Sequence, residues 1–99
     1  MNKKTIFIPN KSNHNYDASK QFGTLVSVTE GNKDLYNLNG LMREMDILYE
    51  SNPDDYILIS GAPIINIIAC SIFASLHGRL NLLLFKKDQT YCERKIVIK

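Results

Sequence analysis

The sequence predicts an α/β fold: a single domain over residues 1–99, with a mostly parallel, twisted sheet of about five strands and helices on both faces. Segments with strand character alternate with segments of helical periodicity along most of the chain. The length of 99 residues suits one hydrophobic core. Near the C-terminal end, two strand segments are separated only by a short polar turn, which predicts an antiparallel hairpin.

The N-terminal part predicts two short strands with a short helix between them. Residues 5–8 are β-branched or aromatic, and the Pro-Asn pair that follows ends the predicted strand. Asp17 is positioned to cap a helix over residues 18–22, and Gly23 terminates it. Residues 24–29 alternate and are rich in β-branched side chains, which predicts the second strand.

The clearest helical period in the chain lies between residues 38 and 49. Charged side chains take the face opposite the apolar one. Asn37 or Asn39 can cap the start of this helix, and an Asn-Pro pair follows its end. The apolar positions are Leu38, Leu41, Met42, Met45, Leu48 and Tyr49.

The next segment predicts a buried strand over residues 56–59, a tight Ser60-Gly61 turn and a helix over residues 63–77. Proline suits the first helical position because its missing N–H would be unpaired there anyway. Gly78 can adopt the left-handed conformation that commonly ends a helix. Almost every face of the helix is apolar, which predicts that it is buried on most sides.

The C-terminal segment predicts the hairpin. Residues 79–85 form a near-continuous apolar run, which is typical of a central strand covered on both faces. Polar residues 87–89 form the predicted turn. Charged side chains are interleaved in residues 91–98, as expected for an edge or interface strand.

This order of elements predicts a Rossmann-like sheet in which strands one, three and four are parallel. The carboxyl ends of parallel strands meet at one edge of a sheet. Segments 9–11, 60–61 and 85–86 are therefore expected at the same rim. Open α/β sheets bind ligands at such a rim.

The Ser60-Gly61 turn precedes a helix, and the free N–H groups and the dipole at a helix N-terminus favour phosphate or carboxylate. The same turn is also the short connection that any strand–helix unit needs. Polar residues following strand one, together with cations near the C-terminal end, can contact or neutralise the same ligand. The predicted ligand-binding residues are Asn10, Lys11, His14, Ser60, Gly61, Lys86 and Arg94.

Two of the candidate residues, His14 and Arg94, have alternative interpretations. His14 can be oriented by Asp17 to contact a ligand, or it can be a plain exposed loop residue. Arg79 is a further cation expected to meet an anion. Arg94 shares strand parity with Cys92, which predicts a buried or interface face where it needs a phosphate, a carboxylate or an internal salt bridge.

Catalytic chemistry has little support in the sequence. No nucleophile–base pair stands at diagnostic spacing, and the adjacent Asp54 and Asp55 are interpreted as the exposed lead-in to a strand. Two histidines without a neighbouring cluster of cysteines or acids argue against a metal site. No cofactor is expected.

Charge and cysteine content limit the possible partners. The net charge is +2, with basic ends and an acidic middle; this predicts either a mixed solvated surface or basic ends that converge on one anion-binding pocket. A general nucleic-acid-binding protein would be more basic.

Cys70 and Cys92 lack a C-x-x-C spacing, which fits a reducing, cytoplasmic setting. The apolar helix, with about 15 residues, is shorter than the roughly 20 needed to cross a membrane.

Residues 22–31, 55–63 and 77–85, with Tyr91 after them, resemble a largely uncharacterised family of small α/β proteins encoded by bacteriophages and other mobile elements. Phage proteins of this size are often host-takeover or anti-defence factors, and some sequester nucleotide-derived immune signals. The resemblance therefore implies a binding protein more readily than a catalyst.

From these observations we expect a phage-type protein that acts as a sponge in the cytoplasm of an infected cell. Its expected ligand is a phosphorylated, nucleotide-derived immune signal of the cyclic-nucleotide or ADP-ribose type. One alternative is a protein-interaction module that inhibits a host enzyme, and another is a nuclease or phosphodiesterase that degrades such a nucleotide. Apolar residues 96–98 on both faces of the last strand predict a homo-oligomer.

Overall fold

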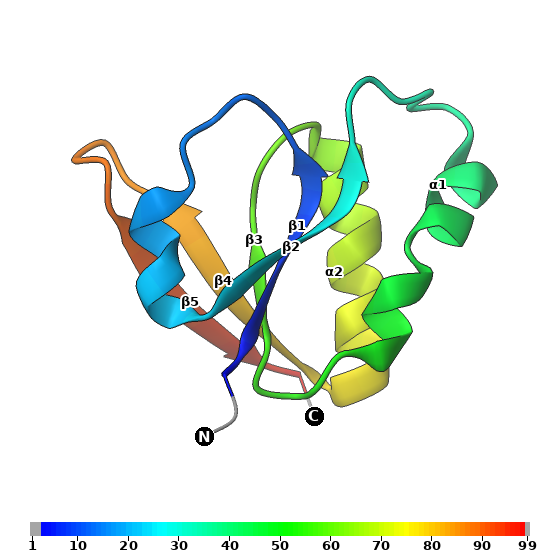
Figure 1. Ribbon diagram of the computed structural model, residues 1–99. Helices are drawn as coiled ribbons and strands as arrows, with labels where there is room; N and C mark the ends of the chain where they lie inside the picture. The colour runs from blue at the N-terminus through cyan, green and yellow to red at the C-terminus, as the bar shows by residue number, and fades with distance from the viewer. Residues whose placement is uncertain (1–2, 99) are drawn as a thin grey trace.

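Five strands form one mixed sheet (Figure 1). They are β1 (Thr5–Lys11), β2 (Thr24–Glu30), β3 (Tyr56–Leu58), β4 (Arg79–Phe85) and β5 (Tyr91–Val97). The computed structural model describes residues 3–98. The order across the sheet is β2-β1-β3-β4-β5. β1 is parallel to β2 and β3, β3 is parallel to β4, and β4 and β5 form the antiparallel hairpin, so the predicted α/β fold is confirmed.

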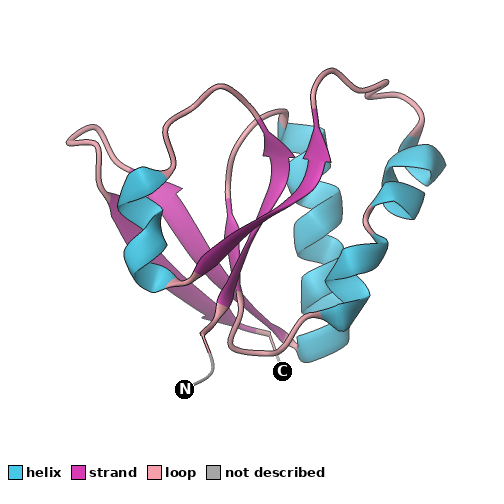
Figure 2. Cartoon of the chain, in the orientation of Figure 1, coloured by secondary structure: helices cyan, strands magenta, loops and turns pink. Residues whose placement is uncertain are grey.

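Helices cover both faces of the sheet, as predicted (Figure 2). Two α-helices, α1 (Leu38–Glu44) and α2 (Pro63–His77), lie with the 3₁₀ helix η2 (Asp46–Glu50) on one face, which we call the helical face. The 3₁₀ helix η1 (Asp17–Phe22) lies on the other, which we call the opposite face. The described part of the chain holds no helix that is both long enough and apolar enough to cross a membrane.

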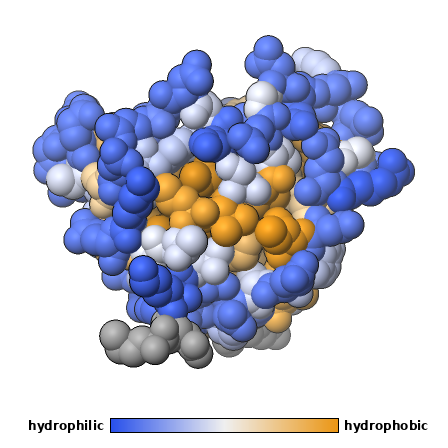
Figure 3. Space-filling model, in the orientation of Figure 1, coloured by the Kyte–Doolittle hydropathy of each residue, from blue (hydrophilic) through white to orange (hydrophobic). Residues whose placement is uncertain are grey.

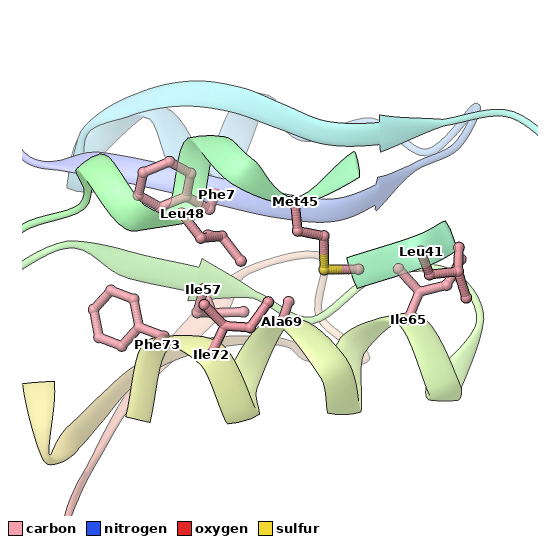
Figure 4. Close-up of a cluster of buried hydrophobic side chains, with 9 residues drawn as sticks. All are labelled: Phe7, Leu41, Met45, Leu48, Ile57, Ile65, Ala69, Ile72 and Phe73. Atoms are coloured by element: carbon pink, nitrogen blue, oxygen red, sulfur yellow. The ribbon is translucent and has the colours of Figure 1, made fainter. Parts of the chain in front are cut away.

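Each face of the sheet has its own core. Burial of each large apolar side chain contributes about 1.5–3 kcal/mol. The buried cluster on the helical face, shown in Figure 4, consists of Phe7, Leu41, Met45, Leu48, Ile57, Ile65, Ala69, Ile72 and Phe73. The cluster on the opposite face consists of Ile6, Ile8, Tyr16, Tyr56, Leu58, Leu83 and Tyr91.

The bounds of α2 agree with the prediction from local sequence signals. Pro63 occupies its first turn, and Gly78 follows its last residue with φ +69°, in the left-handed region. The Gly78 N–H donates to the Ala74 carbonyl oxygen at 2.8 Å, which closes the end of the helix. The predicted bounds of β4 are confirmed as well.

The single helix predicted over residues 38–49 is wrong, because the chain divides it at Met45. Asn37 caps the first part: its side chain accepts the Gly40 N–H at 3.1 Å. After Met45 the chain continues as the tighter 3₁₀ helix η2. This division keeps Leu48 in the same buried cluster as Leu41 and Met45.

β1 runs further than predicted and includes Pro9 and the two residues after it. Asn10 pairs with Thr29 in the ladder with β2, and Lys11 pairs with Glu30. On its other side β1 pairs with β3 only near its start, at Ile6 and Phe7. Proline is tolerated in the strand because it lies beyond that second ladder.

The segment that connects β1 to β2 corrects the predicted cap. Asp17 is the first residue of η1 and not its cap; Tyr16 takes the cap position, and no described side chain caps the helix. In the turn before it, the Asn15 side-chain oxygen accepts the Asp17 N–H at 2.8 Å. The carboxylate of Asp17 instead lies 3.0 Å from Lys20 Nζ. Gly23 follows η1, as predicted.

Asp55 is buried, which corrects its interpretation as part of an exposed lead-in; only its neighbour Asp54 is exposed. The Asp55 carboxylate accepts the N–H of Thr5 at 2.9 Å and the N–H of Asn52 at 2.8 Å. Asp55 therefore joins the start of β1 to the loop that leads into β3. Sequence reasoning missed this role because Thr5, fifty positions away, is brought to Asp55 only by the fold.

β4 is not covered on both faces, contrary to the prediction. Asn81 and Leu83 are buried within it, but Leu84 and Phe85 are exposed and Leu82 is half-buried. α2 covers the helical face of β4 only in part, and the chain continues from β4 into β5 instead of into another helix. The prediction that β5 is an edge strand is confirmed.

Tyr56 on β3 links the stability of the core on the opposite face to pH. Its hydroxyl donates a hydrogen bond to the Glu93 carboxylate on β5. Burial, that hydrogen bond and the charge of Glu93 raise the pKa of Tyr56 to about 12. In the unfolded chain a tyrosine ionises near pH 10. Because the unfolded state loses this proton first, Tyr56 contributes stability below about pH 10 that is lost as the pH rises towards about 12.

As the pH rises from about 10 to about 12, we expect the free energy of unfolding to fall less in Tyr56→Phe than in the wild type. The difference between the two losses should reach up to about 2 kcal/mol. The measurement is urea unfolding of both proteins across this pH range. The slope of the free energy of unfolding against pH is compared, and not its absolute value, because the variant also lacks a hydrogen bond. Parallel losses in the two proteins would contradict the assignment.

Candidate functional site

The carboxyl ends of β1 to β4 lie at one rim of the sheet, at the top of Figure 1. From β1 the chain crosses to β2 on one side, and from β3 it crosses to β4 on the other. The rim between β1 and β3 is therefore a topological switch point, the place where open α/β sheets bind ligands. The loops after β1 and β3 meet there.

Gly61 allows the loop after β3 to pass very close to β1. Its φ is +83°, in the left-handed region. A Cβ atom at this position would lie 2.9 Å from the Asn10 carbonyl oxygen and 2.8 Å from Asn10 Oδ1. The turn therefore requires glycine for both its conformation and its contact with Asn10.

The structure changes which N–H groups of this turn are available to a ligand. The Ser60 N–H, predicted to be free, donates to Asn66 Oδ1 at 3.0 Å. Asn66 is buried and its amide also donates to the carbonyl oxygens of Ser60, at 2.8 Å, and Ala62, at 2.9 Å. The N–H groups of Gly61 and Ala62 form no hydrogen bond with residues 3–98.

Asn66 was missed as a site residue. The only sequence signal was its position as the first polar interruption of an apolar helix, one turn from the N-terminus. Its side chain holds the turn through three hydrogen bonds, and the next two N–H groups, of Gly61 and Ala62, stay without an acceptor among the described residues.

Two adjoining hollows, which share three lining residues, open beside this turn, and together we call them the rim groove. The larger has a volume of about 500 Å³ and is lined by Asn10, Lys11, Ser12, Asn13, Glu30, Gly31 and Asn32. The smaller has a volume of about 240 Å³ and is lined by Asn10, Gly31, Asn32, Lys33, Leu35, Ala62 and Ile65. The top of the molecule in Figure 3 is correspondingly hydrophilic.

Asn10 forms the wall shared by the two hollows. Its amide donates to Thr29 Oγ1 at 3.0 Å and to the Gly31 carbonyl oxygen at 3.1 Å, which ties β1 to the end of β2. Lys11 is exposed and forms no ion pair with residues 3–98. Lys33, by contrast, is held by Glu44 at 2.7 Å.

His14 lies at the same rim, but above the opposite face. Its Nε2 is 3.2 Å from the Tyr91 hydroxyl. The ring packs edge-on against Phe85, with 4.4 Å between ring centroids. The predicted His14–Asp17 pair is wrong, because Asp17 binds Lys20 instead.

Tyr16 joins the loops after β1 and β3, and sequence reasoning missed it. Its hydroxyl is 2.7 Å from Ser60 Oγ and 3.2 Å from Ser12 Oγ, and it accepts the Ser12 N–H at 3.1 Å. Burial acts to raise the pKa of Tyr16, but the bonds to Ser12 and Ser60, with Lys11 nearby, lower it below its ordinary value. An aromatic residue in a polar loop was the only signal that pointed to it.

The remaining predicted cations do not converge on the rim groove. Lys86 is in the β4–β5 turn, with Nζ 3.9 Å from Asp88. Arg94 projects from the helical face of β5 opposite Leu82, within the strand. Arg79 begins β4, at the other end of the sheet, and lies 3.9 Å from Asp54.

The single cationic pocket expected from the two basic ends is thus not formed at the rim. Lys3 and Lys4 line a hollow at the amino ends of the strands together with Asp54 and Asp55. Of the predicted site residues, Asn10 and Lys11 line the rim groove, and Gly61 packs against Asn10. His14 and Ser60 lie beside the groove, in contact with Tyr91 and Tyr16 respectively.

A family comparison covers almost the whole described chain. Residues 4–98 match the family described as phage Pam3 gp32-like protein. The chain belongs to this family. No curated protein and no solved structure matches it. The resemblance to small phage proteins is therefore confirmed, while the anti-defence role stays a prediction.

In this member of the phage Pam3 gp32-like family, the rim offers hydrogen-bond donors, amide groups and one exposed cation. Residues 3–98 bring together no group of three His, Cys, Asp or Glu side chains that could hold a metal ion. The arrangement suits recognition of a small anion with polar substituents.

Proposed function

We propose that this phage protein binds a small phosphorylated, nucleotide-derived ligand in the rim groove and thereby sequesters a host immune signal in the cytoplasm of the infected cell. One observation carries the proposal: Ala62, whose N–H has no hydrogen-bond partner among residues 3–98, and Lys11 line the two adjoining hollows of the rim groove at the topological switch point.

The chemistry of the groove suits the two parts of such a ligand. A phosphate is favoured at the start of α2, where N–H groups and the helix dipole carry partial positive charge. Lys11 adds a full positive charge. The side-chain amides of Asn13 and Asn32 and the hydroxyl of Ser12 can bond to sugar or base atoms. The larger hollow, at about 500 Å³, has the size of a small-molecule site.

Thermal unfolding in the presence of cyclic nucleotides and ADP-ribose derivatives tests the proposal. A ligand at about one hundred times its dissociation constant stabilises the folded state by about 2.7 kcal/mol. For a domain of this size, that corresponds to a rise in Tm of roughly 10 °C or more. If no member of the panel raises the Tm, the proposal fails for these classes of nucleotide.

Lys11→Glu gives the sharpest test of the location. Reversing the charge beside the groove should weaken binding about tenfold or more, because a charge-assisted contact becomes repulsive. Lys87→Glu is the matched control, since Lys87 is also exposed but belongs to the β4–β5 turn. The measurement is isothermal titration with the nucleotide that gave the largest Tm shift. Equal affinity in the two variants would place the ligand elsewhere.

Sequestration and hydrolysis are separated by what happens to the ligand. Recovery of the bound nucleotide unchanged after long incubation with excess protein supports a sponge. Release of a cleavage product would instead assign the nuclease or phosphodiesterase alternative.

The interaction-module alternative is supported by the outer edge of β5. Its residues from Arg94 to Val97 are exposed, and an unpaired edge can accept a strand from another protein. A host enzyme captured in stoichiometric amount and inhibited, without any nucleotide-dependent Tm shift, would favour this function over the first.

A further inference from the structure

Glu30 contributes the only carboxylate among the described residues that line the rim groove. It is the last residue of β2, it is exposed, and it lines the larger hollow together with Lys11. The proposed ligand is phosphorylated, and a carboxylate repels a phosphate group. Contact with Glu30 therefore suits a different part of the same ligand.

The Glu30 carboxylate has no partner among the described residues. In the ladder between β1 and β2, Glu30 pairs with Lys11, and neighbouring strands lie only about 4.7–4.9 Å apart. The two side chains nevertheless form no ion pair or hydrogen bond with each other or with any other residue among 3–98. Lys33, which lines the smaller hollow, is by contrast held by Glu44 at 2.7 Å. Glu30 and Lys11 are thus both available to a ligand.

The two hollows of the rim groove differ in charge. Glu30 and Lys11 line the larger hollow, where their opposite charges offset each other. Ala62 lines the smaller hollow, and its N–H has no acceptor among residues 3–98. The start of α2 gives this end of the groove partial positive charge. A phosphate is therefore favoured beside Ala62, and an uncharged polar group is favoured beside Glu30.

We propose, on the basis of the function above, that Glu30 binds the 2′- and 3′-hydroxyl groups of the ligand's ribose and so selects nucleotides of the ADP-ribose type over cyclic nucleotides. A carboxylate only accepts hydrogen bonds, and its two oxygens can each accept one of two adjacent hydroxyl groups. Hydrogen bonds to an ionised group are roughly twice as strong as those between neutral groups. A 3′,5′-cyclic nucleotide keeps only one of the two hydroxyl groups and gains less from this contact.

The position of Glu30 in the sheet supports this role. Figure 1 shows the carboxyl ends of β1 and β2 side by side at the upper edge of the sheet. In dinucleotide-binding α/β sheets, an acidic residue about 20 positions after the turn that follows the first strand bonds to a ribose hydroxyl. Glu30 comes 19 positions after Lys11, the last residue of β1. The likeness is one of position only, because the turn with free N–H groups follows β3 in this chain.

Isothermal titration with two matched nucleotides tests the contact. 5′-AMP, the adenosine half of ADP-ribose, and its 2′,3′-dideoxy analogue share the base and the phosphate and differ only in the two hydroxyl groups. The wild type is expected to bind 5′-AMP about tenfold more tightly than the analogue, or better. Glu30→Gln should remove most of this preference: the affinity for 5′-AMP falls, while the affinity for the analogue stays the same or rises because a charge that repels phosphate is gone.

Glu50→Gln is the matched control and should leave both affinities unchanged, because Glu50 is also exposed but ends η2 and lines neither hollow. If Glu30→Gln strengthens the binding of both nucleotides, Glu30 only repels phosphate; if it weakens both equally, Glu30 only supports the fold. Either result overturns the proposed contact.

The wild type separates this contact from the function on which it rests. Thermal shifts caused by nucleotides, together with binding of 5′-AMP no tighter than that of its dideoxy analogue, would overturn the role of Glu30 and leave the proposed function in place. If neither cyclic nucleotides nor ADP-ribose derivatives bind at all, both fail.

Discussion

Replacing Gly23 by alanine should destabilise the protein by about 3 kcal/mol, one of the two largest effects expected of a single change. A Cβ at this position would lie 2.2 Å from the Lys4 carbonyl oxygen, far inside van der Waals contact. That oxygen cannot move away freely, because it accepts the Thr24 N–H at 2.9 Å. The substitution therefore separates the starts of β1 and β2.

The measurement is urea unfolding, and Gly31→Ala is the matched control. Gly31 has a left-handed φ of +76°, but a Cβ there would meet no atom within 4 Å. The control should therefore cost only the conformational strain of a left-handed alanine, about 1 kcal/mol. If Gly23→Ala costs no more than the control, the close contact with Lys4 is not what requires glycine.

Removing the buried carboxylate of Asp55 should have an effect of similar size. Asp55 is 4% exposed, and its two oxygens each accept one backbone N–H. Asp55→Ala leaves the Thr5 and Asn52 N–H groups without these acceptors, at a cost of about 1–3 kcal/mol each. We expect a total of about 3 kcal/mol. Asp55→Asn keeps one acceptor oxygen and should lose about half of that.

Urea unfolding of the Asp55 variants has an adjacent control. Asp54→Asn removes a charge that is exposed and lies 3.9 Å from Arg79, a pair that should contribute less than about 1 kcal/mol. The expected order of destabilisation is Asp55→Ala, Asp55→Asn and Asp54→Asn. A larger loss for Asp54→Asn than for Asp55→Asn would contradict the role given to the buried carboxylate.

At the candidate site, the sequence predicted the location of the Ser60-Gly61 turn but not its hydrogen-bond partners. The Ser60-Gly61 turn lies at the rim between β1 and β3, as its place after a strand and before a helix predicted. Asn66, six residues later, occupies the Ser60 N–H, so the available donors are Gly61 and Ala62. Tyr16 then holds the Ser60 hydroxyl at 2.7 Å. Neither partner is adjacent to Ser60 in the sequence.

The sequence by itself determined the features that depend on neighbouring residues. Pro63 and Gly78 bound α2, one of the two candidate asparagines, Asn37, caps α1, and the alternation of elements gives the parallel sheet with its final hairpin. These follow from backbone geometry and hydrogen bonds within a few positions, which local sequence specifies.

Only the tertiary structure decided which polar groups are paired within the fold and which stay exposed. It buries Asp55 against Thr5, fifty positions away, and moves Arg94 away from the rim to the helical face of β5. It also leaves Lys11 as the exposed cation of the rim groove and couples His14 to Tyr91. The physical reason is that such pairings depend on strand order and register, which bring distant residues together after the local elements have formed.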